Sequence, residues 1–231
     1  MNKVIIDGID LYSEYGLLLS SKVISPPSPK VLTIDIPAAD GCIDLTEAIN
    51  GETKYNNREI SLVFTKVGIS SVSLSTYRLI SNKFHGKICE MVFSDIPSYY
   101  YKGRVSVKSF ETDKGVGTLE ITCDAEPYAL EVLDSTDDFI WDDFNFDTDV
   151  ARGYKDIEID GEKTIEVYGS RKTVCPDIIV SSAMDVEFKG ITYHLQEGTN
   201  KVISIAIVEG SNAMKFTGTG TVTIKFRGGA L

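Results

Sequence analysis

The stretch Tyr55-Asn56-Asn57-Arg58-Glu59-Ile60-Ser61-Leu62-Val63-Phe64 decides the fold of the N-terminal half. Its apolar residues Ile60, Leu62 and Phe64 alternate with Glu59, Ser61 and Val63, which is the period-2 pattern of a half-buried strand. The stretch follows a predicted turn at Gly41-Cys42-Ile43-Asp44-Leu45-Thr46. We therefore expect this strand to form the centre of an N-terminal sheet.

Two side chains at the start of the strand are suited to holding another segment or another subunit. Arg58 offers a rigid fork of five donors for a carbonyl or carboxylate, and Tyr55 offers an amphipathic ring. The alternative is a surface loop with a solvated arginine. Downstream, Tyr99-Tyr100-Tyr101 places rings on both faces of a strand, so at least one ring should be exposed or covered by a partner. The candidate contact residues are Tyr55, Asn57, Arg58, Tyr99, Tyr101 and Trp141.

The rest of the N-terminal half predicts short strands and one helix. Pro26-Pro27-Ser28-Pro29 predicts a surface loop or an edge, because proline cannot donate to a sheet ladder. A helix is predicted over about 75–85, where Tyr77, Ile80 and Phe84 share one face and Gly86 follows the end. Further strands are predicted over 87–93, 99–107 and 116–123, with a turn at Asp95-Ile96-Pro97.

The C-terminal half predicts only strands. Turn signals recur about every eight to twelve residues from Lys155 onward, which is typical of an antiparallel sandwich. Asp160-Gly161 is predicted to be a hairpin turn between two of these strands. The predicted fold is mainly β, with an N-terminal domain over 1–130, an acidic aromatic connector over 131–154 and a C-terminal domain over 155–231.

Composition excludes several classes of function. The 231 residues carry a net charge of −11, which argues against general nucleic-acid binding and against docking on an anionic membrane. No apolar run approaches the length of a membrane span, and no signal peptide is predicted, so we expect folding in a cytoplasm. The four cysteines are far apart and form no CxxC pair, so neither a zinc site nor a disulfide framework is predicted.

Catalytic and ligand motifs are weak throughout. Only His85 and His194 could act as a histidine base, and no Gly-x-Ser-x-Gly elbow is present, so a catalytic triad is not predicted. No motif selects a carboxylate pair for a glycoside hydrolase, although that alternative stays open. The connector fails the EF-hand pattern at Thr148 and Tyr154 but leaves a looser calcium site open. Sugar binding would depend on Tyr168 and Tyr193, since the only tryptophan, Trp141, lies in the connector.

The order of these parts resembles the distal tail proteins of long, non-contractile-tailed bacteriophages. The resemblance covers nearly the whole chain and rests on the segment 41–46, on Tyr55-x-Asn57-Arg58, on the single helix and on two later segments. These are Cys123-Asp124-Ala125-Glu126-Pro127-Tyr128 and Gly218-x-Gly220-x-Val222-x-Ile224-x-Phe226-Arg227-x-Gly229-x-Leu231. Each motif is short, and their order and spacing carry the resemblance.

The resemblance implies a non-enzymatic virion component without cofactor or metal. It implies an N-terminal β-sandwich with a helix that closes into a hexameric ring, and a galectin-like or carbohydrate-module-like C-terminal β-sandwich. Such a ring joins the tail tube protein to tail-tip, tail-associated lysin or baseplate proteins and leaves a channel for DNA, in the virion tail of a phage or prophage assembled in a bacterial cytoplasm. No sequence-specific nucleic-acid binding and no membrane insertion are expected. The alternative is a two-domain cell-surface carbohydrate-binding protein.

Overall fold

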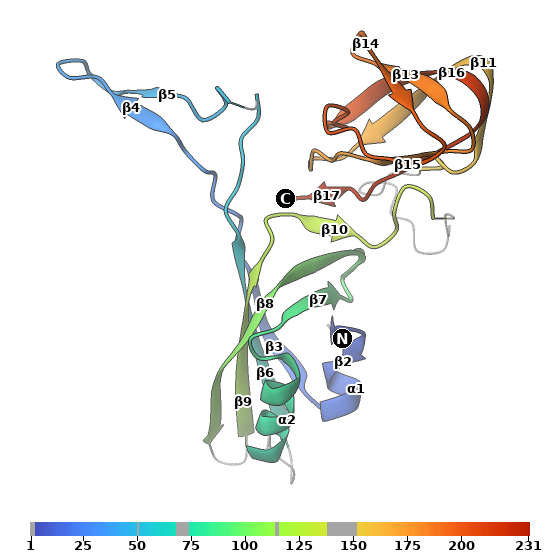
Figure 1. Ribbon diagram of the computed structural model, residues 1–231. Coiled ribbons are helices and arrows are strands. Elements are labelled where there is room, and N and C mark those ends of the chain that lie inside the picture. The colour runs from blue at the N-terminus through green and yellow to red at the C-terminus, as the bar shows by residue number, and fades with distance from the viewer. Residues whose placement is uncertain (1–2, 50, 68–73, 114–115, 138–151) are drawn as a thin grey trace. The chain divides into compact units, whose positions relative to one another are not determined.

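The computed structural model describes residues 3–49, 51–67, 74–113, 116–137 and 152–231 (Figure 1). Their contacts divide the chain into two compact units. The first unit consists of Met1–Ile96 and Tyr101–Pro127, and the second consists of Pro97–Tyr100 and Tyr128–Leu231. The domain boundaries expected from the sequence stay a prediction, because most of the connector, residues 138–151, lies outside the described residues.

In its described residues, the first unit holds one large antiparallel sheet, a separate hairpin and two helices. The sheet runs in the order β2-β1-β7-β8-β9-β6-β3, and β4 pairs only with β5. Its elements are β1 (Val4–Ile6), β2 (Ile9–Asp10), α1 (Leu11–Tyr15), β3 (Leu18–Ile24), β4 (Thr33–Asp35), β5 (Cys42–Asp44), β6 (Arg58–Val67), α2 (Leu74–Phe84), β7 (Ile88–Phe93), β8 (Ile96–Asp113) and β9 (Val116–Ala125).

The second unit is all strand in its described residues. The sheet order is β14-β13-β16-β12-β15, with β11 paired to β16, while β10 pairs with β17 and with Tyr99 and Tyr100 of β8. Its elements are β10 (Ala129–Glu131), β11 (Ile157–Gly169), β12 (Asp177–Val180), β13 (Met184–Phe188), β14 (Ile191–Leu195), β15 (Gly198–Asn200), β16 (Gly210–Lys225) and β17 (Gly229–Ala230). The mainly β fold predicted from the sequence is confirmed.

The strand predicted from 55–64 is β6, and its alternating apolar side chains belong to the core. Ile60, Leu62 and Phe64 are at most 1% exposed, whereas Ser61 and Val63 on the other face are only partly buried. Both neighbours of β6 are antiparallel, with Leu62 opposite Ile121 of β9 and opposite Lys22 of β3. β6 is not the central strand that we expected, because it is the last but one strand of the sheet, between β9 and the edge strand β3, and its apolar residues line the buried side of the sheet there.

The predicted helix is α2, and its apolar residues face inward as expected. Ile80 and Phe84 are buried, and the ring of Tyr77 stacks on Phe110 with centroids 5.6 Å apart. Gly86 follows the helix with a φ of 77°, the left-handed conformation that glycine adopts at low cost. Cys89 and Cys123 are both buried, and burial raises the pKa of each thiol to about 12.

The turn predicted at Asp160-Gly161 is wrong. These residues lie inside β11, which runs unbroken from residue 157 to 169 beside β16. Gly161 is paired with Gly218 and has a φ of 83°, while Gly218 and Gly220 have φ values of 151° and 145°. The glycines therefore bend a continuous two-strand ribbon instead of reversing the chain. The turn predicted at Asp95-Ile96-Pro97 is also displaced, because β8 already begins at Ile96.

The short helix α1 was not predicted and depends on its cap. The carboxylate of Asp10 accepts hydrogen bonds from the backbone N–H groups of Tyr12 (2.9 Å) and Ser13 (3.4 Å) and from the Ser13 hydroxyl (2.7 Å). These bonds, the Ser13 hydroxyl first, lower the pKa of Asp10 to about 2, and Lys3 adds an ion pair at 3.2 Å. Gly16 closes the other end of the helix in the left-handed conformation.

We expect Asp10→Ala to lower the free energy of unfolding by about 1 kcal/mol near neutral pH, because it removes a cap on the helix N-terminus. Above the ordinary pKa of 3.8, the Asp10 carboxylate is ionised in both the folded and the unfolded protein, and its full stabilising effect is present. The difference from wild type should therefore shrink as the pH falls from 3.8 toward 2. Urea unfolding at pH 6 and pH 2.5 measures it. Glu14→Gln, which removes the same charge one turn later, should show a smaller effect at pH 6; an equal effect would contradict the capping role.

Candidate functional site

Arg58 is buried, so the solvated arginine that we held as the alternative is excluded. Its side chain lies at the start of β6 and is 5% exposed. Its Nη2 donates to the carbonyl oxygen of Pro127 at 2.5 Å, and its guanidinium lies 5.4 Å from the centre of the Tyr101 ring. Burial lowers the pKa of Arg58, and Tyr101 partly opposes this. Arg58 thus joins three segments of one chain, while a contact with another subunit stays a prediction.

Of the predicted contact residues, those other than Arg58 and Tyr101 lie apart from these two. Tyr55 forms an isolated antiparallel bridge with Pro29, and Asn57 is exposed just before β6. Tyr101 is buried with Arg58, whereas Tyr99 belongs to the second unit, opposite Glu131 of β10. Trp141 lies outside the described residues. The structure therefore brings together Arg58 and Tyr101 of the predicted set.

Replacing Arg58 by methionine should lower the free energy of unfolding by about 2 kcal/mol, because the charged hydrogen bond is lost and the Pro127 carbonyl loses that donor. Chemical unfolding measures the change. Arg104 also donates to a backbone carbonyl, that of Gly86, but from an exposed site, so Arg104→Met should cost clearly less. Equal losses for the two variants would show that burial of Arg58 adds nothing.

A feature that we did not predict is the hairpin over residues 30–54, here called the arm. Strands β4 and β5 pair with Ile34 directly opposite Ile43, and the backbone N–H of Lys30 donates to the carbonyl of Lys54 (2.7 Å) at its base. On the face that carries Ile34 and Ile43, the exposed fractions are 48% for Leu32, 50% for Ile34, 44% for Ile36 and 47% for Ile43. The opposite face carries Thr33, Asp35, Cys42 and Asp44. The arm is therefore an amphipathic ribbon whose apolar face is open to solvent.

The signal for the arm was present in the sequence. Leu32-Thr33-Ile34-Asp35-Ile36 alternates apolar and polar residues, as does Cys42-Ile43-Asp44-Leu45. From this pattern we expected only a short extended segment over 31–36 after the proline-rich loop, and we expected a turn over 41–46. The turn expected over 41–46 is wrong, because Cys42–Asp44 is a strand, and within 41–46 the left-handed backbone is that of Gly41, with a φ of 78°.

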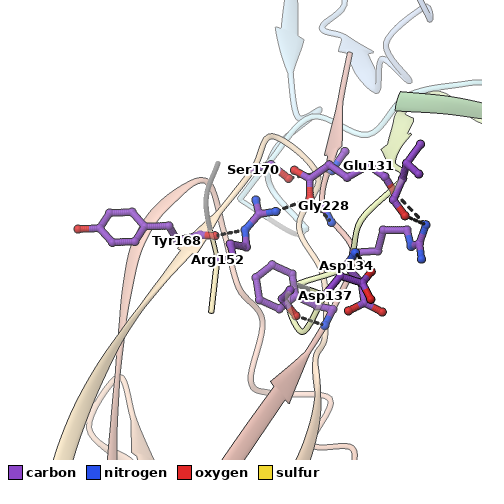
Figure 2. Close-up of polar contacts among 12 residues, drawn as sticks. Glu131, Asp134, Asp137, Arg152, Tyr168, Ser170 and Gly228 are labelled. Atoms are coloured by element: carbon purple, nitrogen blue, oxygen red, sulfur yellow. Dashed lines mark hydrogen bonds and ion pairs between the residues drawn. The ribbon is translucent and has the colours of Figure 1, made fainter. Parts of the chain in front are cut away.

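Within the second unit, a buried ion pair and its hydrogen bonds join four segments of the chain (Figure 2). Arg152 donates from Nη1 to the carboxylate of Glu131 and from Nε to the carbonyl of Tyr168 (3.0 Å). The same Glu131 carboxylate accepts the backbone N–H of Gly228 at 3.2 Å. The side chains of Arg152 and Glu131 are only 4% and 12% exposed. This cluster, here called the clasp, fixes the C-terminal segment to β10.

The two histidines are engaged with neighbouring groups of the fold. His85 Nδ1 accepts the backbone N–H of Val107 at 3.0 Å, so this nitrogen is occupied. His194 lies on β14 and its Nδ1 is hydrogen-bonded to Asp185, with 79% of the His194 side chain exposed. In the described residues, no group of three or more His, Cys, Asp and Glu is arranged to hold a metal ion. Nor is any described helix long and apolar enough to cross a membrane.

The chain is similar in fold to known proteins among the solved structures. No protein-family model matches the chain, and no curated protein matches its sequence. Among solved structures, the crystal structure of SPP1 Dit (gp 19.1) matches with a TM-score of 0.57 and 14% sequence identity, covering 98% of this chain and 99% of that one. The chain shares the fold of SPP1 Dit. That protein is described as a paradigm of the hub adsorption apparatus in phages that infect Gram-positive bacteria.

Proposed function

We propose that this protein is a non-enzymatic structural component of a phage or prophage tail. In this proposal six copies form a ring at the distal end of the tail tube, join the tube to tail-tip or baseplate proteins, and leave a channel for DNA. The observation that carries the proposal is the shared fold with SPP1 Dit along almost the full length of both chains. A match confined to one β-sandwich would not carry it, because such folds serve many functions.

The arm supports an assembly of several copies. An isolated two-stranded ribbon is marginally stable in water, and this one exposes four large aliphatic side chains on one face. Burial of that face against another chain would stabilise both the arm and the assembly. A ring is the form that satisfies such contacts in every copy without growing into fibres.

The mass of the purified protein in solution tests this proposal. Light scattering should give about six times the monomer mass of 25.4 kDa, and negative-stain images of the same fraction should show rings with a central hole. The carbohydrate-binding alternative expects a monomer with measurable affinity on a glycan array. A protein that stays monomeric up to the highest soluble concentration would overturn the hexameric hub.

A further inference from the structure

Strand β11 leaves one of its edges without a neighbouring strand. Its 13 residues pair with β16 on one side, and within the part of the chain that the structure describes no strand pairs with the other side, here called the open edge. The five residues from 160 to 164 are all exposed. An edge of this kind presents backbone N–H and C=O groups to which a further strand can add.

Hydrogen bonds near the end of β11 show which residues turn their backbone toward the open edge. The N–H of Tyr168 donates to the Tyr154 hydroxyl at 2.9 Å, and the Tyr168 carbonyl accepts from Arg152 Nε at 3.0 Å. The carbonyl of Glu166 accepts from the same tyrosine hydroxyl at 3.2 Å. Because the pairing with β16 runs without a register shift, every even-numbered residue of β11 faces the open edge.

Three of these residues, near the middle of β11, have backbone groups that a further strand could use. They are Asp160, Glu162 and Thr164, and among the described residues nothing hydrogen-bonds to their N–H or C=O groups. One end of this stretch is closed by Lys163, whose Nζ donates to the carbonyl of Glu158 at 3.0 Å. The tyrosine hydroxyl closes the other end. The stretch is therefore about five residues long, or about 16 Å at the rise of a β-strand.

The side chains along the open edge are acidic. Glu158, Asp160 and Glu162 are exposed on the outer face of β11, and Glu166 follows on the same face. Glu162 is paired with Lys215 Nζ at 3.0 Å, whereas no described residue forms an ion pair with Asp160 or Glu158. Two copies that paired here about Glu162 would place Glu158 opposite Glu166, and like charges directly opposite one another destabilise a strand pair. The open edge is therefore protected against pairing with itself.

We propose that the open edge binds an extended, basic segment of another polypeptide, which adds to the sheet as a further strand. Hydrogen bonds to the backbone of Asp160, Glu162 and Thr164 would hold the segment. A lysine or arginine at every second position of the segment would lie opposite a carboxylate. The carboxylates thus exclude a second copy and select a basic partner. This contact does not depend on the hexameric ring, because residues 160–164 are exposed in the single chain.

The probe is a short peptide of alternating threonine and lysine, blocked at both ends. The full chain is titrated with it while amide hydrogen exchange is followed by NMR. At saturation the amides of Asp160, Glu162 and Thr164 should exchange more than about tenfold more slowly. The amides of Gly161 and Lys163 are already paired with β16 and should not change. This alternation is specific to an added strand, because a peptide held by charge alone protects no particular set of amides.

Matched comparisons separate strand addition from attraction between charges. The same peptide with N-methyl groups on the backbone of its lysines keeps its charge but loses those donors, so it should bind more than about tenfold more weakly. Asp160→Lys should weaken binding by a similar factor. Glu187→Lys, the same change of charge at an exposed position of β13, should change it by less than about threefold. Thr164→Pro removes an outward N–H without breaking a hydrogen bond to β16, and it should also weaken binding.

Other results overturn the inference. Equal binding of the N-methylated peptide, or equal losses for Asp160→Lys and Glu187→Lys, would show general attraction to an acidic surface. Slower exchange without alternation along β11 would exclude an added strand, and so would the lack of saturable binding at about 1 mM peptide. Should Thr164→Pro fail to fold by circular dichroism, Asp160→Lys and the N-methylated peptide still decide the question.

Discussion

Glu131→Ala should lower the free energy of unfolding of the second unit by about 3–5 kcal/mol, a large share of the stability of an ordinary domain. The loss follows from what remains: the Arg152 guanidinium stays buried without its carboxylate partner, and its Nη2 already has no hydrogen-bond partner in the structure. The Gly228 N–H loses its acceptor as well. Calorimetry together with urea unfolding measures the change.

A double-mutant cycle separates the ion pair from simple loss of packing. Arg152→Met should also destabilise strongly, but Glu131→Ala combined with Arg152→Met should cost much less than the sum of the two single changes, because no charge is left buried. The exposed pair of Arg171 and Glu209, at 3.0 Å with side chains 52% and 61% exposed, is the matched control. Glu209→Ala should change the free energy of unfolding by less than about 1 kcal/mol. Additive effects at Glu131 and Arg152 would contradict the clasp.

The clasp also explains a glycine near the C-terminus. A Cβ at Gly228 would lie 2.4 Å from the carboxylate of Glu131 and 2.4 Å from the hydroxyl of Ser170. Ser170 accepts the next backbone N–H, that of Gly229, at 2.8 Å. The two glycines therefore let the backbone approach the side chains of Glu131 and Ser170 closely enough to form both hydrogen bonds. This close approach, and not a turn, explains the pair Gly228-Gly229.

Local sequence patterns predicted a helix or strand correctly where that element packs on the core of its own unit. The alternation of Ile60, Leu62 and Phe64 predicted β6, and the spacing of Ile80 and Phe84 predicted α2. Both patterns arise because one face of the element packs on the core and the other face meets solvent, whichever segments form that core. The same logic gave the strands of the second unit and the mainly β class.

Local patterns failed where a distant segment decides the outcome. Asp160-Gly161 has turn chemistry, but pairing with Gly218, far along the chain, holds it in a continuous strand. Arg58 belongs to a residue type that is mostly exposed, and its burial depends on a carbonyl at Pro127, 69 residues away. The alternating apolar residues of the arm predict a half-buried strand, yet the surface proposed to bury them belongs to another copy, about which a single sequence holds no direct signal.

Trypsin should release residues 31–54 from the Ile34→Glu variant more than about tenfold faster than from the wild-type assembly. Lys30 and Lys54 lie at the base of the arm, and no lysine or arginine lies between them, so two cuts remove it as one peptide. In a single chain the arm has only its own two strands to stabilise it, and such a segment opens locally at low cost. In the proposed ring its apolar face is buried, and each cut must wait for the subunits to separate.

Mass spectrometry of timed digests measures the release, and Thr33→Glu, which leaves the apolar face intact, should be protected as wild type. The protection should also fall when the wild-type protein is diluted below the concentration at which the proposed ring dissociates, because stability gained by association depends on concentration. Equal rates of release from the wild-type assembly and from Ile34→Glu would mean that the arm stays open after assembly. The contact between copies would then have to be made by other surfaces, and the exposed aliphatic face of the arm would be free to bind a different tail protein.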